Sequence, residues 1–217
     1  MVSAAAAPLG KWVMWQRISE FITLFVVVEP FGASCTFLAV TAAYKPAEKR
    51  QIAGLSVVIA FAVLLFFIVL GQIIVEAMGI SLRAFQIAGG IVLFLFATWM
   101  ILGEVKEISI GPDSTATSLA IYPIAIPAIA GPGTMLTVIL LTDNDRFSVT
   151  EQAMTTLVVV AVLAVQYVLL LGAEQVSRVI GRSGANVLRR VMGMVLASVA
   201  VNAVLTALSS WLGLPKP

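Results

Sequence analysis

The sequence predicts an all-α protein that crosses a lipid bilayer six times, and three observations support this prediction. First, 60% of the 217 residues are hydrophobic and only 11% are charged, against about 25% charged in soluble domains. Second, the apolar residues fall into blocks of about 20, the helix length that crosses a hydrocarbon core about 30 Å thick. Third, charged residues or Pro/Gly-containing connections separate the blocks. Such a chain lacks the polar surface of a water-soluble protein, so we expect it to lie in a bilayer.

Six apolar blocks follow one another along the chain. They cover residues 18–43, 52–75, 84–103, 119–142, 153–173 and 191–212. The start of the chain is Ala-rich and lacks the cationic segment of a secretory signal, so we interpret residues 1–17 as an N-terminal tail. Residues 18–217 are then expected to form a single transmembrane domain.

The distribution of positive charge predicts the orientation of the spans, because short cytoplasmic loops carry an excess of Lys and Arg. If the N-terminus lies outside the cytoplasm, the inner loops hold eight of the 13 Lys and Arg residues and the outer segments hold five. The sequence therefore favours an arrangement with both termini outside.

Composition also excludes several classes of function. A net charge of +2 excludes a polybasic nucleic-acid binder. The chain has one cysteine, Cys35, and no His, so it offers no Cys/His cluster for zinc, haem or an iron–sulfur centre. We expect neither a metal site nor a cofactor. Without His, and with a single acid well inside the spans, a catalytic site is not expected either, so the chain is not predicted to be an enzyme.

Three sequence matches indicate an internal repeat of three spans. They are Pro30 with Pro132 and residues 79–81 (GIS) with 181–183 (GRS), both 102 apart, and residues 87–89 (IAG) with 191–193 (VMG), 104 apart. The repeats would cover residues 18–103 and 119–212. Because three is odd, the two halves must insert with opposite orientation, as in many secondary transporters.

The first span is interrupted about twelve residues after its start, near the bilayer midplane. Pro30 has no N–H and disfavours the helical conformation of Glu29, so the helix is expected to break there. Glu29 is the only carboxylate well inside any span, and a buried acid of this kind is a functional candidate by default. The alternative is a protonated structural Glu that hydrogen-bonds across helices.

The fourth span carries a matching interruption. Pro123, Pro127 and the run Gly131-Pro132-Gly133-Thr134 make a continuous helix unfavourable. A helix that restarts at Pro132 would point its unpaired amides and its positive end into the membrane. A second half-helix would start at Pro30, with Ser34 in its first turn. Two such N-termini form an anion site suited to a carboxylate. The alternative is a pair of proline kinks that merely bend the spans.

Five segments resemble the MarC family of six-span bacterial and archaeal inner-membrane proteins. They are residues 30–32 (PFG), 83–90 (RAFQIAGG), 123–127 (PIAIP), 130–134 (AGPGT) and 189–193 (RRVMG). The resemblance extends from residue 18 to residue 212, and the AGPGT run is its most specific part. It implies a small transporter related to LysE-type exporters, with small neutral amino acids such as alanine and glycine as substrates. It also implies an inner-membrane location, and the charge distribution then predicts that both termini lie in the periplasm.

The resemblance and the two breaks together define a candidate site. The candidate substrate-binding residues are Glu29, Pro30, Gly32, Ser34, Gly131, Pro132, Gly133, Thr134 and Asn202. The family usually has Asn or Asp at the position of Glu29 and Gln at that of Asn202, so these residues distinguish this chain within the supposed site.

We therefore expect a secondary transporter that moves small neutral amino acids across the inner membrane and is coupled to H+ or Na+. Glu29 is placed to exchange protons, whereas backbone carbonyls freed at the breaks could bind Na+, and the sequence does not separate the two. The alternative is a channel or broad-specificity efflux protein for small solutes or drugs. A structural membrane protein without transport is a further alternative, and a homo-oligomer is compatible with the sequence.

Overall fold

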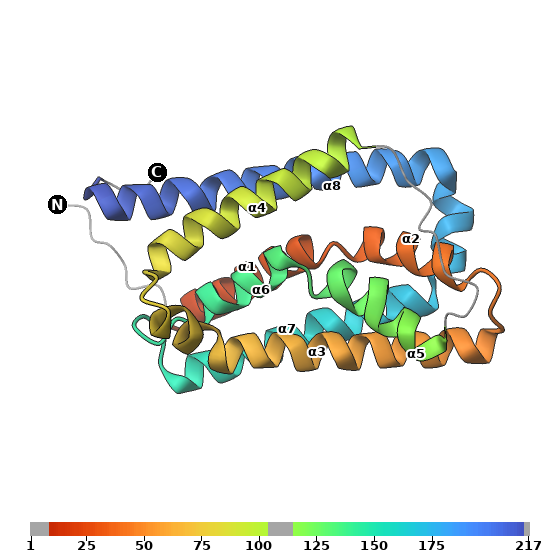
Figure 1. The fold of residues 1–217 in the computed structure, drawn as a ribbon, viewed down its shortest axis with the longest axis horizontal. Coiled ribbons are helices and arrows are strands. Elements are labelled where there is room, and N and C mark those ends of the chain that lie inside the picture. The colour runs from red at the N-terminus through yellow and green to blue at the C-terminus, as the bar shows by residue number, and fades with distance from the viewer. Residues whose placement is uncertain (1–8, 104–114, 215–217) are drawn as a thin grey trace.

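The computed structural model describes residues 9–103 and 115–214, and in these ranges its regular secondary structure is helical throughout (Figure 1). The elements in chain order are α1 (Leu9–Val28), α2 (Pro30–Thr41), α3 (Pro46–Ala77), α4 (Leu82–Leu102), α5 (Ala116–Leu119), the π-helical η1 (Ala120–Ile129), α6 (Pro132–Leu141), α7 (Val149–Leu171) and α8 (Ala173–Leu212).

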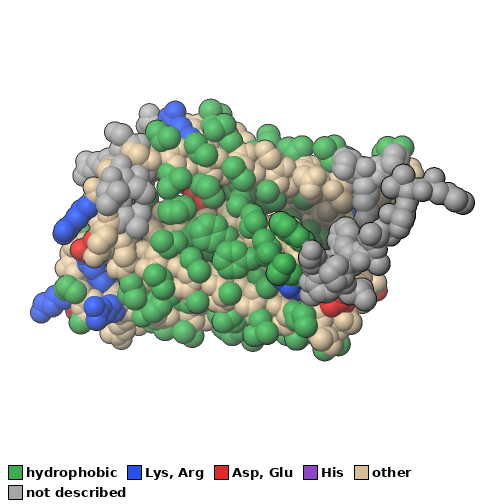
Figure 2. Space-filling view, turned by 180° about the vertical axis from the view of Figure 1, so that it is seen from behind, with side chains coloured by type: hydrophobic (Ala, Val, Ile, Leu, Met, Phe, Trp, Pro, Cys, Tyr) green, Lys and Arg blue, Asp and Glu red, His purple; other side chains and the backbone are tan. Residues whose placement is uncertain are grey.

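The helices confirm that the chain is an integral membrane protein. Five helical segments are long and apolar enough to cross a bilayer, and a sixth span results if the bent pair 116–129 and 132–141 counts as one. The outer surface is apolar too: Val58, Leu95 and Val168 each expose more than 60% of their surface. Figure 2 shows hydrophobic side chains spread over the middle of one face, with most Lys and Arg side chains toward its ends. Lipid is the solvent that suits such a surface.

Two helices extend beyond the predicted apolar blocks. Helix α1 begins at Leu9, so residues 9–17, which we expected to lie in the tail, are helical, while residues 1–8 lie outside the described ranges. Helix α8 begins at Ala173, well before the predicted sixth span, and is interrupted at Gly181, whose φ is 66°. Hydropathy marks the part of a helix that lies in lipid, and it does not mark where the hydrogen-bonded helix ends.

The helices pack mainly as antiparallel neighbours. Helix α4 lies along α8 and α3 lies along α7, and in each pair the two chains run in opposite directions (Figure 1). Small residues bring α4 and α8 close: a Cβ on Gly90 would lie 3.2 Å from the Ala200 carbonyl oxygen, and one on Gly193 would lie 3.2 Å from that of Ala97. Close backbone approach of this kind is typical of helix packing in membranes. The start of α1 and the end of α8 lie at the same end of the bundle.

Polar contacts join helices near both ends of the bundle. Toward the end that holds the start of α1, Arg17 Nη1 donates to Glu20 Oε2 at 2.7 Å and to Thr155 Oγ1 of α7 at 3.0 Å. At the opposite end, Lys49 of α3 forms a 2.6 Å ion pair with Glu174 of α8. The hydrogen bond and the positive charge of Lys49 lower the pKa of Glu174 below its usual 4.5. Between these contacts, the interior of the bundle is mostly apolar.

Candidate functional site

The chain breaks first at Glu29, between α1 and α2. Glu29 has φ 51° and ψ 62°, a left-handed conformation that is uncommon for a residue with a side chain and costs roughly 1–3 kcal/mol. Its carbonyl accepts the first bond of α2, from Ala33 N at 3.1 Å, so Glu29 is the N-cap residue of this helix. Pro30 follows at the first helical position, where its missing N–H removes no hydrogen bond.

The side chain of Glu29 is buried against the first turn of its own half-helix. Only 8% of the residue is exposed. A Cβ on Gly32 would lie 2.7 Å from Glu29 Cδ and 2.8 Å from Oε2, so the carboxylate occupies the space that Gly32 leaves free. Here the positive end of α2 stabilises a negative charge. Among the described residues, none forms a hydrogen bond or ion pair with the carboxylate.

The second break lies between η1 and α6. Tyr122 and Ile126, which precede the two prolines of η1, have extended backbone angles, as residues before proline prefer. After Ile129 the chain bends by 58° and restarts as a helix at Pro132. Gly131 is needed at this bend, because a Cβ there would lie 2.7 Å from the Pro127 carbonyl oxygen.

The N-terminus of α6 leaves backbone amides without partners in its helix. The first bond of the helix runs from Met135 N to the Gly131 carbonyl at 3.0 Å, and Gly131 provides no side-chain cap. The N–H groups of Gly133 and Thr134 therefore have no acceptor in the helix. These groups and the helix dipole favour an anion at this position.

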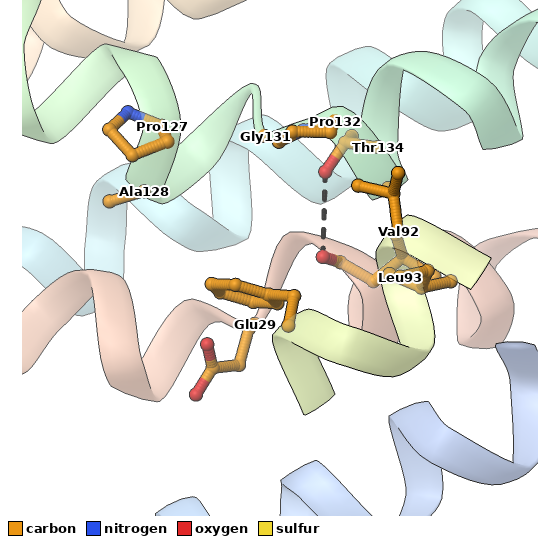
Figure 3. Close-up of a pocket in the computed structure, with 11 residues that line it drawn as sticks. Glu29, Val92, Leu93, Pro127, Ala128, Gly131, Pro132 and Thr134 are labelled. Atoms are coloured by element: carbon orange, nitrogen blue, oxygen red, sulfur yellow. Dashed lines mark hydrogen bonds between the residues drawn. The ribbon is translucent and has the colours of Figure 1, made fainter. Parts of the chain in front are cut away.

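Both breaks line one small cavity (Figure 3). Four elements form its wall: the end of α1 with Glu29, the middle of α4, the end of η1 and the start of α6. The lining residues are Val27, Glu29, Val92, Leu93, Phe96, Pro127, Ala128, Gly131, Pro132, Gly133 and Thr134. The carboxylate of Glu29 points away from the hydroxyl of Thr134.

Thr134 connects the two breaks. Its side chain is 1% exposed, and its hydroxyl oxygen lies 3.1 Å from the Ile129 carbonyl oxygen and 3.4 Å from the Val27 carbonyl oxygen. Ile129 is the last residue of η1, and Val27 lies one residue before the end of α1. A single side chain therefore holds together the ends of two interrupted helices.

The cavity brings together five of the nine predicted site residues: Glu29, Gly131, Pro132, Gly133 and Thr134. Gly32 and Pro30 adjoin Glu29 without lining the cavity. Ser34 is buried, but its hydroxyl donates to the Pro30 carbonyl at 2.7 Å within the same helix. Asn202 is exposed on α8 and does not line the cavity.

The sequence analysis missed the contribution of α4 and of Arg189. One wall of the cavity comes from α4, through Val92, Leu93 and Phe96. These are apolar residues in an apolar span, so the sequence does not mark them as part of a site. The sequence analysis used Arg189 as an orientation signal and as part of the family segment 189–193. In the structure its Nη2 donates to the Gly103 carbonyl and its guanidinium carbon lies 5.7 Å from the Trp99 ring centroid.

Comparison with known families shows to which family the chain belongs. The family described as "MarC family integral membrane protein" matches residues 14–212. The chain belongs to the MarC family. A UPF0056 membrane protein of Methanocaldococcus jannaschii is 34% identical over 197 residues, which is 88% of this chain and 95% of the relative. The UPF0056 membrane protein YvbG of Bacillus subtilis is 32% identical over 190 residues, covering 85% and 90%.

Further relatives of this MarC-family protein include the UPF0056 inner membrane protein YhgN of Escherichia coli. It is 30% identical over 201 residues, which is 92% of this chain and 99% of the relative. No solved structure matches the chain. The family predicted from the sequence motifs is thus confirmed.

Proposed function

We propose that this MarC-family protein is a secondary transporter of small neutral amino acids. The observation that carries the proposal is the cavity shared by the two helix breaks, which is lined by the uncapped start of α6 and by Glu29, a buried acid. An α-amino acid presents the complementary pair of charges, a carboxylate and an ammonium group.

The chemistry of the cavity supports a small zwitterion as the ligand. The substrate carboxylate would accept hydrogen bonds from the N–H groups of Gly133 and Thr134, and its ammonium group would pair with Glu29. The wall from α4 is apolar, so a charged substrate side chain would lose its hydration without a partner there.

The packing of the helices supports an inverted repeat with the cavity at its centre. Helix α3 packs on η1 as α7 packs on α1, and α4 packs on α6 as α8 packs on α2. Exchanging the two halves therefore preserves these four neighbour pairs. The half-helices α2 and α6 start at prolines 102 residues apart, and Gly79 and Gly181 share a positive φ, 70° and 66°. Rocking of one repeat against the other would give alternating access.

The charge pattern supports an inner-membrane orientation with both termini in the periplasm. The start of α1 and the end of α8 lie at one end of the bundle, and Lys45, Lys49 and Arg50 lie at or just before the start of α3, at the other end. Under the positive-inside rule the second end faces the cytoplasm.

The test is uptake and counterflow in proteoliposomes that contain the purified protein. Labelled alanine should exchange for internal unlabelled alanine and should accumulate when an ion gradient is imposed, with pH and Na+ gradients varied separately. Glycine should compete, whereas lysine and glutamate should not. A channel would equilibrate alanine without concentrating it, and that outcome would reject a coupled transporter. Absence of alanine counterflow would reject the substrate class.

A further inference from the structure

The carbonyl ends of the two interrupted helices converge on one side chain. Val27 O and Ile129 O lie 3.4 Å and 3.1 Å from Thr134 Oγ1. The last carbonyls of a helix have no partner in that helix, and they carry the negative end of its dipole. These two chain ends beside one hydroxyl place three oxygen atoms together inside the protein, one of them at the negative end of α1.

The available hydrogen bonds do not satisfy these oxygens. A Thr hydroxyl has one proton, and each carbonyl oxygen has two lone pairs. The proton can donate to the Ile129 carbonyl at 3.1 Å, and the contact to Val27 at 3.4 Å then lacks a donor. The hydroxyl oxygen keeps its own lone pairs. An unpaired buried carbonyl is unfavourable in a membrane protein, so the Val27 carbonyl has a lone pair available for a further donor or a cation.

We propose that Val27 O, Ile129 O and Thr134 Oγ1 bind the sodium ion that drives transport. The proposal deepens the proposed function by naming its coupling ion. A hard cation of this size is held by oxygen ligands at about 2.4 Å, and oxygens 3.1–3.4 Å apart then subtend about 80–90° at the ion. Freed carbonyls and helix C-terminal ends are the groups that coordinate ions in discontinuous spans.

The surroundings favour a monovalent ion. Among the described residues no group of three His, Cys, Asp or Glu side chains could hold a metal ion, so the charge needed for a divalent ion is lacking. Val27 and Thr134 also line the cavity, so water from that cavity would complete the coordination of the ion. The carbonyl ends of the breaks would thus bind the cation, and the amide end of α6 would bind the substrate carboxylate.

The experiment measures the thermal stability of the purified protein without substrate, in NaCl, KCl or choline chloride at equal ionic strength. A tenfold excess of Na+ over its Kd should raise Tm by roughly 3–6 °C, with a smaller rise in K+. Thr134→Ser retains the hydroxyl and should retain the Na+-specific rise, whereas Thr134→Val should lose it. Thr137→Val is the matched control, because the Thr137 hydroxyl donates to the Gly133 carbonyl at 2.8 Å within the same helix. This variant should respond to Na+ as the unmodified protein does.

Equal Tm in Na+, K+ and choline would overturn the proposal, as would a Na+-specific rise retained in Thr134→Val. The comparison of salts uses the unmodified protein, so it decides the matter even if Thr134→Val does not fold. Labelled alanine binding is measured on the same samples. Alanine binding without a Na+ effect would overturn the sodium site and leave the transporter proposal intact. A Na+ effect without alanine binding would support the sodium site and reject the substrate.

Discussion

The two helix breaks are alike in sequence, because a proline starts the next helix in each, but they differ in the charge beside that helix start. Each is followed by a helix that starts at a proline, Pro30 in α2 and Pro132 in α6. Before Pro30 stands Glu29, in a left-handed conformation that turns its carboxylate over the first turn of α2. Before Pro132 stands Gly131, with extended angles and no side chain. The first break therefore contains its own anion, and the second leaves its amides open.

This difference would make the proposed site asymmetric, although both half-helices start at a proline. Two open helix N-termini would attract two anions, whereas one open and one occupied N-terminus suits a ligand with one carboxylate and one ammonium group. The variants below alter one break at a time, and their effects should differ in a defined order.

The largest effect is expected from the first break. Glu29→Gln keeps the shape of the side chain but removes the charge that we propose pairs with the substrate ammonium group. Loss of one partner of a buried ion pair should weaken alanine binding by about 100-fold or more. Binding of labelled alanine to the purified protein measures the change.

Glu20→Gln is the matched control for that substitution. Glu20 is also a buried acid of α1, at 6% exposure, but it pairs with Arg17 and does not line the cavity. This variant should lower Tm and leave alanine affinity unchanged. Equal loss of affinity in both variants would mean that α1 needs buried acids for folding and that the two breaks do not differ in function.

A smaller effect is expected from the second break. In Gly133→Ala the added methyl would press on the Leu93 side chain and lie 3.4 Å from Val27 Cγ1. Overpacking costs about 1–3 kcal/mol, which exceeds the helix-propensity gain of up to about 1 kcal/mol. Tm should fall, and alanine affinity should decrease roughly tenfold because the wall of the cavity shifts.

Gly54→Ala is the control for this substitution, because the nearest atom to its new Cβ is Tyr167 Cε2 at 3.9 Å. Tm and alanine affinity should both be retained or rise slightly. If Gly133→Ala behaves in the same way, the start of α6 has more room than the structure gives it, and the second break is only a bend.

The smallest effect is expected at the end of the bundle, away from both breaks. Since Lys49 lowers the pKa of Glu174 below 4.5 in the folded state, the pair stabilises the protein above that pH, and the contribution is lost as pH falls through the folded pKa. Thermal melts of Glu174→Gln should thus lose slightly less stability on acidification than the unmodified protein. Alanine affinity should not change, and a change would indicate that this ion pair acts on the cavity.

The positions of the two helix breaks and the buried acid beside the first one could be predicted from the sequence. Proline has no N–H wherever it stands, so the starts of α2 and α6 at Pro30 and Pro132 follow from local rules. A carboxylate inside an apolar span is equally visible, and Glu29 is buried as expected.

The rest depends on tertiary packing, which has no local signal. The direction of the Glu29 carboxylate follows from the space at Gly32, and the wall from α4 consists of apolar residues that resemble their neighbours. Ser34 was placed in the site by its position, but its hydroxyl bonds the carbonyl four residues earlier. Asn202 lies on an exposed face of α8, which the helical pattern alone did not reveal.

The measurement that tests the shared site most directly compares three ligands on two proteins. Alanine, propionate (which lacks the ammonium group) and ethylamine (which lacks the carboxylate) compete against labelled alanine on the unmodified protein and on Glu29→Gln. We predict that the unmodified protein binds alanine about 100-fold more tightly than propionate. In Glu29→Gln alanine should weaken to the level of propionate, while propionate itself is unaffected. If the substitution weakens both ligands equally, or alanine keeps its advantage, Glu29 does not bind the ammonium group and the two breaks do not form one site.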